Sequence, residues 1–295
     1  MPIWKTIRRL LEDPPPAFVF EFSPGGIAVA RHGRPPQIGW LPLDPDVLSV
    51  SPVHDNVVRP QALLAQIRAA APGNGNRVRP AALILPDYSA RVAVLDFDSF
   101  PSSSDEQMSL VRFRMKKTVP FDLDSAVLAY HASSVGGRHE VVVAVAAMEI
   151  VARYEAAVRG AGLQPGLITT SMLAAVDLLR HVEGITVTAK LSGVALSVAV
   201  TDGRRLKLLR SVELPAATAG EVLELLHPTF AYVEDELGQR PRQLLLCGFG
   251  ESTEDLRQRA EAELGVASGP LRSRWGTPDG TNAGLFGYLE AAVEG

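Results

Sequence analysis

Residues 111–130 read VRFRMKKTVPFDLDSAVLAY, which predicts a basic helix, a stop at a proline, a turn and a strand. The apolar residues Met108, Val111 and Met115 recur at helical spacing, and basic side chains lie between them. Pro120 ends the helix because it disfavours helical geometry at the residue before it. By composition alone this is an ordinary helix–turn–strand unit, so the fold it belongs to must be inferred from the rest of the chain.

The whole chain has 295 residues, a formal net charge of −4 and 46% hydrophobic residues. This length suffices for one large or two medium domains, and the charge argues against a broad nucleic-acid surface. Its longest apolar runs, such as residues 141–148, are far shorter than the roughly 20 residues of a membrane-spanning helix. The single cysteine, Cys247, excludes an intrachain disulfide. Because residues 1–16 also lack the apolar core of a signal peptide, we expect a cytoplasmic protein.

The same order of predicted elements occurs twice. Strands at residues 17–22, 27–31 and 37–41 precede a helix at 59–71 and a buried strand at 81–85. About 170 residues later, strands at 186–191, 194–200 and 205–214 precede a helical segment at 221–237 and a buried strand at 243–247. Pro228 either kinks that second helical segment or divides it into two helices. Repetition without sequence identity predicts an α/β fold built from two related halves.

Residues 87–160 interrupt the first half. They contain the opening segment, a strand at 141–146 and a helix at 149–159. The predicted division is an N-terminal segment (1–16), the first half (17–86 and 161–182), the inserted subdomain (87–160) and the second half (183–295). Within residues 1–13 we expect a short helix, with Trp4 and Ile7 near one face, that packs loosely on its own domain or touches an anionic membrane.

Several motifs together resemble the PilM family, the actin-like cytoplasmic proteins of type IV pilus assembly. They are the opening segment, the strand VVVAVA at 141–146 with its following helix, Gly162-Leu163-Gln164-Pro165 and the closing NAGLFGYL at 282–289. FtsA, a cell-division relative, is similar but more distant. The resemblance implies an actin-like fold of duplicated ββαβα-type halves with an FtsA-like inserted subdomain. The family's helical subdomain in the second half is expected to be reduced or absent, since few residues separate Leu214 from Glu221.

In this fold, the resemblance implies, two glycine-bearing hairpins hold a nucleotide, and an aspartate in each acts on the bound Mg²⁺. Close backbone approach to phosphate needs glycine, and the metal needs hard oxygen ligands. At the first aspartate's position stands Glu21, and at the second Lys190, so a cation replaces an acid. We therefore expect a degenerate nucleotide site, whereas an intact one would hold ATP with Mg²⁺. Its candidate residues are Glu21, Ser23, Gly25, Gly26, Lys190, Ser192, Gly193, Gly248 and Gly250.

No other catalytic or metal-binding set is recognisable. Gly248-Phe249-Gly250 is similar to the start of a dinucleotide-binding fingerprint, but Thr253 occupies the place of the third glycine. The six histidines show no metal-ligand spacing.

The function implied by the resemblance is that of a cytoplasmic scaffold in a pilus assembly machine, associated with the inner membrane through its partners. Its main partner would be the N-terminal tail of the membrane protein PilN, bound as an extended peptide between the first half and the inserted subdomain. The basic helix could favour an acidic tail, or the lipid surface beside it, through Arg112, Arg114, Lys116 and Lys117. The alternative is that these charges only solvate the helix. The alternatives are an ATPase or small-molecule kinase of the same fold, and a cytoplasmic scaffold of type II secretion.

Overall fold

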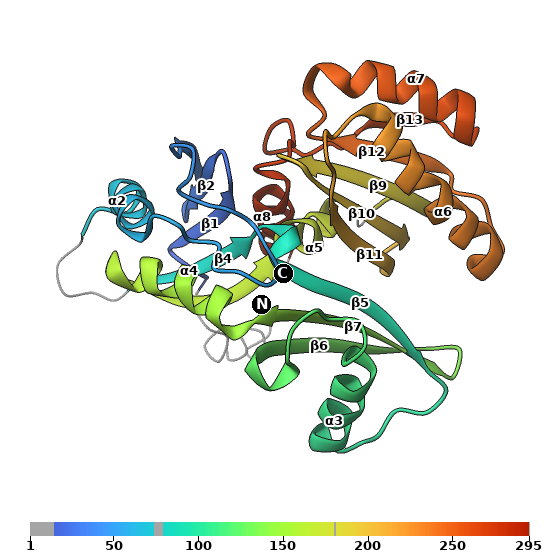
Figure 1. The fold of residues 1–295 in the computed structure, drawn as a ribbon, viewed down its shortest axis with the longest axis horizontal. Coiled ribbons are helices and arrows are strands. Elements are labelled where there is room, and N and C mark those ends of the chain that lie inside the picture. Colours follow the sequence, from blue (N-terminus) through green and yellow to red (C-terminus); the bar gives the residue numbers. More distant parts are fainter. Residues whose placement is uncertain (1–14, 74–78, 180, 295) are drawn as a thin grey trace, which may run out of the picture.

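The computed structural model describes residues 15–73, 79–179 and 181–294, which form two five-stranded sheets and one three-stranded sheet (Figure 1). The short helix expected within residues 1–13 lies outside these residues. None of the helices in the described ranges is long and apolar enough to cross a bilayer.

The first sheet has the strand order β3-β2-β1-β4-β8. β1 pairs antiparallel with β2 and parallel with β4, and β8 forms one edge of the sheet. Its strands are β1 (Phe18–Ser23), β2 (Gly26–Arg31), β3 (Gln37–Pro42), β4 (Arg79–Leu85) and β8 (Leu163–Thr170).

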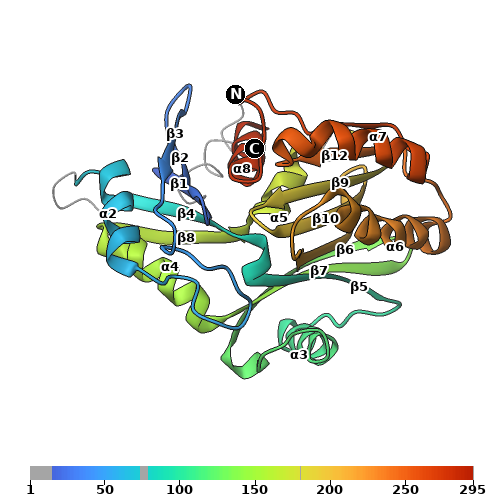
Figure 2. The same ribbon diagram turned by 45° about the horizontal axis from the view of Figure 1, so that its top comes forward.

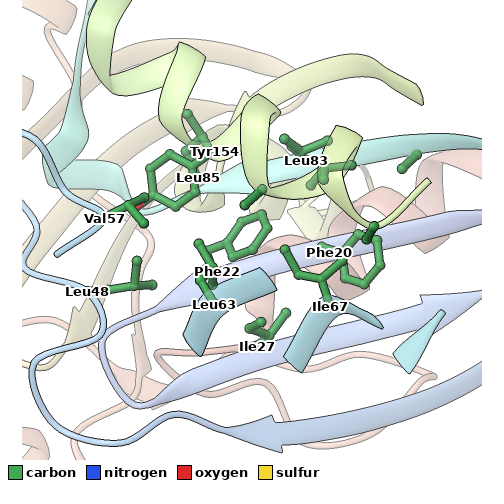
Figure 3. Packing of buried hydrophobic residues seen from close by; sticks show 14 of the residues in the cluster. Phe20, Phe22, Ile27, Leu48, Val57, Leu63, Ile67, Leu83, Leu85 and Tyr154 are labelled. Carbon is green, nitrogen blue, oxygen red and sulfur yellow. The ribbon is translucent and has the colours of Figure 1, made fainter. Parts of the chain in front are cut away.

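Alternation along β1 gives this sheet two buried faces. Phe20 and Phe22 point toward α2 (Pro60–Ala70) and α4 (Met148–Gly160), as Figure 3 shows. The ring of Phe22 lies 5.0 Å from that of Tyr154 in α4, measured between centroids. Residues between the phenylalanines, including Val19, point to the other face, where α8 (Ala283–Glu294) packs. The period of two thus decides which side chains of β1 meet which helix.

The second sheet repeats the arrangement, with the order β11-β10-β9-β12-β13. One of its faces is covered by α6 (Ala219–Leu237) and α7 (Thr253–Leu264), which contribute to one apolar core. Its strands are β9 (Ile185–Ser192), β10 (Ala195–Asp202), β11 (Arg205–Glu213), β12 (Gln243–Cys247) and β13 (Ser268–Pro270). The matching strand orders confirm the predicted duplication.

Two helices join the halves. α5 (Ser171–Ala175), continued by a 3₁₀ turn at Val176–Leu179, packs on α8 between the two large sheets (Figure 2). A Cβ atom on Gly287 of α8 would lie 2.1 Å from the carbonyl oxygen of Ala174. Only glycine therefore allows this crossing, which holds the two halves together.

The third sheet belongs to the insertion and has the order β5-β7-β6. Its strands are β5 (Ala90–Phe97), β6 (Ala126–Val135) and β7 (Arg138–Ala147). One face packs on α3 (Ser104–Met115), which buries Val111 and Met115 as its sequence predicts. The edge strand β5 runs beside β11, where an ion pair joins Glu140 to Lys207 of the second half. Within the described residues, no strand pairs with the outer side of the other edge strand, β6.

The second half carries no extra helical subdomain at the predicted place. Residues 214–218 alone connect β11 to α6, so the expectation of a reduced or absent subdomain is confirmed. α6 remains one helix although Pro228 lies inside it, which resolves the two alternatives. Its N-terminus is well capped, because the side chains of Thr218 and Glu221 each accept a hydrogen bond from the other's backbone N–H. The sequence of residues 170–180 predicts a helix that closes the first half. In the structure this helix, α5, covers only Ser171–Ala175 and continues as a 3₁₀ turn at Val176–Leu179.

Candidate functional site

The two residues that stand at the acid positions of the hairpins, Glu21 and Lys190, lie on equivalent central strands of the two sheets. Glu21 is in β1 and Lys190 is in β9, and both are 1% exposed. Strand alternation turns Glu21 toward α8, because its neighbours Phe20 and Phe22 face the opposite side. Neither side chain is therefore presented to solvent.

Glu21 caps the N-terminus of α8. Its Oε2 accepts a hydrogen bond of 2.6 Å from the backbone N–H of Leu285, and its Oε1 accepts one of 3.3 Å from that of Gly284. Ser171 Oγ, at the start of α5, donates to the same Oε1. A carboxylate is favourable here because the helix dipole places positive charge at the N-terminus. One buried acid thus fixes the starts of both helices that join the halves.

A second buried acid, Asp87, follows β4 directly and was missed by the sequence analysis. Its Oδ1 accepts a hydrogen bond of 2.5 Å from the backbone N–H of Met172 in α5. Its Oδ2 accepts one of 2.9 Å from Ser197 Oγ on β10 and lies 2.9 Å from Lys190 Nζ. The available signal was Pro86-Asp87 at the end of a buried strand, a position where fixed polar groups meet in α/β sheets.

Lys190 forms an ion pair with Asp87 and also feels the charge of Glu21. Burial disfavours its charged form, but the negative charges of Asp87 and Glu21 outweigh burial and raise the pKa of Lys190. The pKa of Glu21 is also raised, mainly by burial, with Lys190 acting in the opposite direction. The same burial raises the pKa of the nearby Cys247 thiol to about 12. Lys190 is therefore a buried cation at neutral pH, paired with an acid from the other half of the protein.

Of the candidate glycines, Gly26 and Gly248 lie tightly against protein atoms, whereas Gly25 and Gly250 have no other atom of the described residues within 4 Å of a Cβ position. A Cβ atom on Gly193 would lie 4.0 Å from Pro24 Cγ of the first hairpin, so the two hairpin tips approach each other. Gly248 has a φ of +84°, and a Cβ atom there would lie 2.1 Å from the carbonyl oxygen of Leu191 and 2.8 Å from the backbone nitrogen of Gly280. The chain leading into α8 therefore occupies the space against Gly248.

A cavity of about 210 Å³ remains between the hairpins. Ser192 is the one candidate nucleotide residue on its wall. Asp87, Ser197 and Pro24 also line it. Glu21, Ser23, Gly25, Gly26, Lys190, Gly193, Gly248 and Gly250 do not line this cavity. Pockets for drug-sized ligands span about 300–1,000 Å³, so the space is small for a nucleotide.

The donor set at this junction does not fit a Mg²⁺ ion. Mg²⁺ takes oxygen ligands in octahedral geometry and keeps several waters. Here the oxygens of Glu21 and Asp87 already accept hydrogen bonds from two helix N-termini, and the ammonium of Lys190 holds the central position. Within the described ranges, no group of three or more His, Cys, Asp or Glu side chains could hold a metal ion. The arrangement acts as a structural link between the halves.

A second candidate site is a groove of about 510 Å³ between the insertion and the first half. We call it the β6–β8 groove, because the exposed side of β6 and the end of β8 both contribute to its walls. Cross-strand pairing shows which side chains of β6 face it: Ala129 and His131 lie opposite Ala144 and Val142 of β7, which also line the groove. The wall residues include Val127, Ala129, His131, Val142, Ala144, Ile168, Thr169 and Leu173.

The basic helix lies elsewhere. α3 packs on the face of the three-stranded sheet opposite to the β6–β8 groove, and none of its four basic candidates lines that groove. Arg112 donates to the carbonyl oxygen of Leu123 and pairs with Asp124, each at 2.8 Å. The guanidinium carbon of Arg114 lies 5.2 Å from the ring centroid of Phe97, within the distance of a cation–π contact. These two arginines therefore stabilise the subdomain itself.

No known protein family matches the sequence. No curated protein matches it either. Among solved structures, a chain of the PilM–PilN type IV pilus biogenesis complex matches with a TM-score of 0.73 and 20% identity, covering 95% of this chain and 99% of that one.

Two further structures match less closely. The cytoplasmic domain of EpsL, an inner-membrane component of the type II secretion system of Vibrio cholerae, has a TM-score of 0.55 at 10% identity, over 94% of both chains. A Bacteroides thetaiotaomicron protein with an actin-like ATPase fold and unknown function has a TM-score of 0.53 at 13% identity, over 85% of this chain and 90% of that one. The chain thus has an actin-like fold like that of the pilus complex.

Proposed function

We propose that this protein is a cytoplasmic scaffold of a pilus assembly machine, and that it holds the extended N-terminal tail of a PilN-like membrane protein in the β6–β8 groove. The observation that carries the proposal is the groove itself, which lies between edge strands of two different sheets. Through such a partner the protein is associated with the inner membrane.

The groove suits an extended peptide. β6 and β8 are edge strands in the part of the chain that the structure describes, so there each has backbone groups without a partner strand on its outer side. A peptide added to a sheet edge gains affinity from main-chain hydrogen bonds, while pockets for alternate side chains give specificity. The walls are mainly apolar and come from Val127, Ala129, Ala144, Ile168 and Leu173. The expected ligand is therefore a strand with apolar side chains at every second position.

The comparisons support a PilN-like tail as the ligand of the groove. The structure most like this chain among those described above comes from a complex with PilN, and it is covered almost completely. The EpsL match favours the same general role, a cytoplasmic module at an inner-membrane machine. A type II secretion scaffold is the alternative within this class, and it is distinguished by which membrane protein's tail the groove prefers.

We infer that this role does not depend on ATP hydrolysis. Phosphoryl transfer relies on positioned groups and metal ions that neutralise charge on the phosphates. At the junction, Lys190 pairs with Asp87, and both oxygens of Glu21 cap α8. These polar side chains at the junction of the two halves therefore bind protein groups and are not free to bind a nucleotide phosphate. This argues against the alternative of an ATPase or small-molecule kinase.

The experiment is calorimetric titration of the full chain with a synthetic peptide of the PilN-like tail. Ala129→Trp places a large ring on the groove side of β6 and is expected to weaken binding at least tenfold. Ala132→Trp is the matched control, since Ala132 pairs with Val141 and faces the α3 side of the same strand. Equal affinity for the two variants, or no binding by the wild type, would contradict the proposal.

A further inference from the structure

α3 carries an outward face that the groove and its peptide do not use. Phe113 is 73% exposed, the highest value among the exposed large hydrophobic residues of the described chain. Lys116, the C-cap residue of α3, and Lys117, in the turn after it, follow Phe113 by three and four positions, so they lie near its ring at the C-terminal end of the helix. We call Phe113, Lys116 and Lys117 the α3 patch.

The helix is held in place by other residues. Val111 and Met115 are buried against the three-stranded sheet, and Arg112 and Arg114 contact Asp124 and Phe97. By contrast, within the described ranges the ammonium groups of Lys116 and Lys117 make no hydrogen bond or ion pair with the protein. Folding thus explains the inner residues of α3 but leaves an exposed aromatic ring beside two free cations.

The shape around the patch limits what it can bind. α3 lies at the outer edge of the molecule, away from the two large sheets, in both views (Figures 1 and 2). A protruding helix cannot enclose a peptide side chain, as the β6–β8 groove can. It can lie against a broad surface, and the two lysines require that surface to be negatively charged.

We propose that the α3 patch docks on an anionic lipid bilayer. The proposal rests on the proposed function in one respect, namely that a tail belonging to a membrane protein brings this chain close to the membrane. Phe113 then enters the interface between headgroups and acyl chains, and Lys116 and Lys117 contact acidic headgroups. The acids of α3, Asp105 and Glu106, lie in its first turn, so the C-terminal end of the helix approaches the lipid.

Such a contact is weak alone and effective in combination. A lysine near an anionic surface contributes modestly, and one aromatic ring does not anchor a protein permanently. With the tail bound, however, the second contact becomes intramolecular and is strengthened by a high effective concentration. Membrane contact at α3 would therefore orient the scaffold relative to the bilayer.

The test is sedimentation of the full chain with vesicles of phosphatidylcholine containing phosphatidylglycerol, compared with vesicles of phosphatidylcholine alone. Wild type is expected to bind only the anionic vesicles, and less as salt rises. Lys116→Glu with Lys117→Glu should reduce the partition coefficient roughly tenfold or more, and Phe113→Ser should reduce it several-fold. The matched control is Arg31→Glu with Arg34→Glu, which makes the same charge change at exposed positions around the β2–β3 loop.

Circular dichroism verifies that each variant is folded. Unchanged vesicle binding by the α3 variants, or an equal loss in the control, overturns the membrane proposal. So does a concentration-dependent dimer that the α3 variants abolish, because the patch would then bind a second copy. Tail-peptide affinity is measured on the same variants: the membrane proposal predicts no change there, so its failure is separable from failure of the proposed function.

Discussion

Replacing Lys190 by Met is expected to destabilise the protein strongly, although the two side chains are similar in length. The substitution removes a buried cation and leaves Asp87 and Glu21 buried without their counter-charge. Breaking a buried pair by removing one partner costs about 3–5 kcal/mol, because an uncompensated charge remains. For a chain of this size that corresponds to a fall in Tm of roughly 6–20 °C, measured by differential scanning calorimetry.

The loss should depend on pH in a defined direction. Burial raises the pKa of Glu21 in the folded state, and Lys190 opposes that rise, so removing Lys190 raises this pKa further. A carboxyl group with a raised folded-state pKa stabilises the fold below its ordinary value of 4.5, and that contribution is lost as the pH rises through the folded pKa. Lys190, whose pKa is also raised, stays charged in the wild type at pH 5 and pH 8. Relative to wild type, Lys190→Met therefore loses less free energy of unfolding at pH 5 than at pH 8.

A second substitution serves as the control for this reasoning. Asp87→Asn neutralises the partner of Lys190 and keeps a carbonyl oxygen that can accept from the Met172 N–H. The double variant should be less destabilised than the sum of the two single variants, because neutralising both partners removes the unpaired charge. A loss below about 1 kcal/mol for Lys190→Met, independent of pH, would refute the account of a buried charge network.

Three other outcomes are expected. Gly287→Val should lower the free energy of unfolding by about 1–3 kcal/mol, because the new side chain meets the carbonyl oxygen of Ala174. Gly220→Ala at the start of α6 is the control and should not destabilise the protein. Calorimetry of both variants checks this. At pH 8, Cys247 should react with a thiol reagent far more slowly in the native protein than in urea. The reason is that its side chain is 2% exposed and its pKa is raised to about 12. Fast labelling of the native protein would contradict this buried position. Phosphate release from Mg²⁺-ATP should not exceed that of Glu21→Ala, and turnover that this variant abolishes would favour the enzyme.

The strand pattern made much of the fold predictable. Alternation in residues 17–22 marks a strand with Phe20 and Phe22 on one face, and the return of the same order of elements in the second half predicts the duplication. β13 was not predicted, since the three residues Ser268–Pro270 are too few to show any period. The helix predicted at residues 170–180 is too long, because α5 changes to a 3₁₀ turn after Ala175.

The candidate site was predictable only in part. Sequence reasoning identified Glu21 and Lys190 as departures from the acids of a nucleotide site, because each stands in a recognisable hairpin. It could not find Asp87 as their partner, since the pairing is created by the approach of β4 to β9 across the two halves. It also offered the basic residues of this segment as contacts for an acidic tail or for the lipid surface beside it, and it could not show that α3 packs on the face of its sheet opposite to the groove. Which face of a sheet a helix covers depends on tertiary packing that periodicity does not specify.

Hydrogen–deuterium exchange of the full chain with saturating PilN-like tail peptide, and separately with Mg²⁺-ATP, distinguishes peptide binding in the groove from nucleotide binding between the hairpins. We expect slower exchange of backbone amides in β6 and β8 with the peptide, and no change in either hairpin with the nucleotide. Protection of the hairpins by Mg²⁺-ATP, with β6 and β8 unaffected by the peptide, would contradict this expectation.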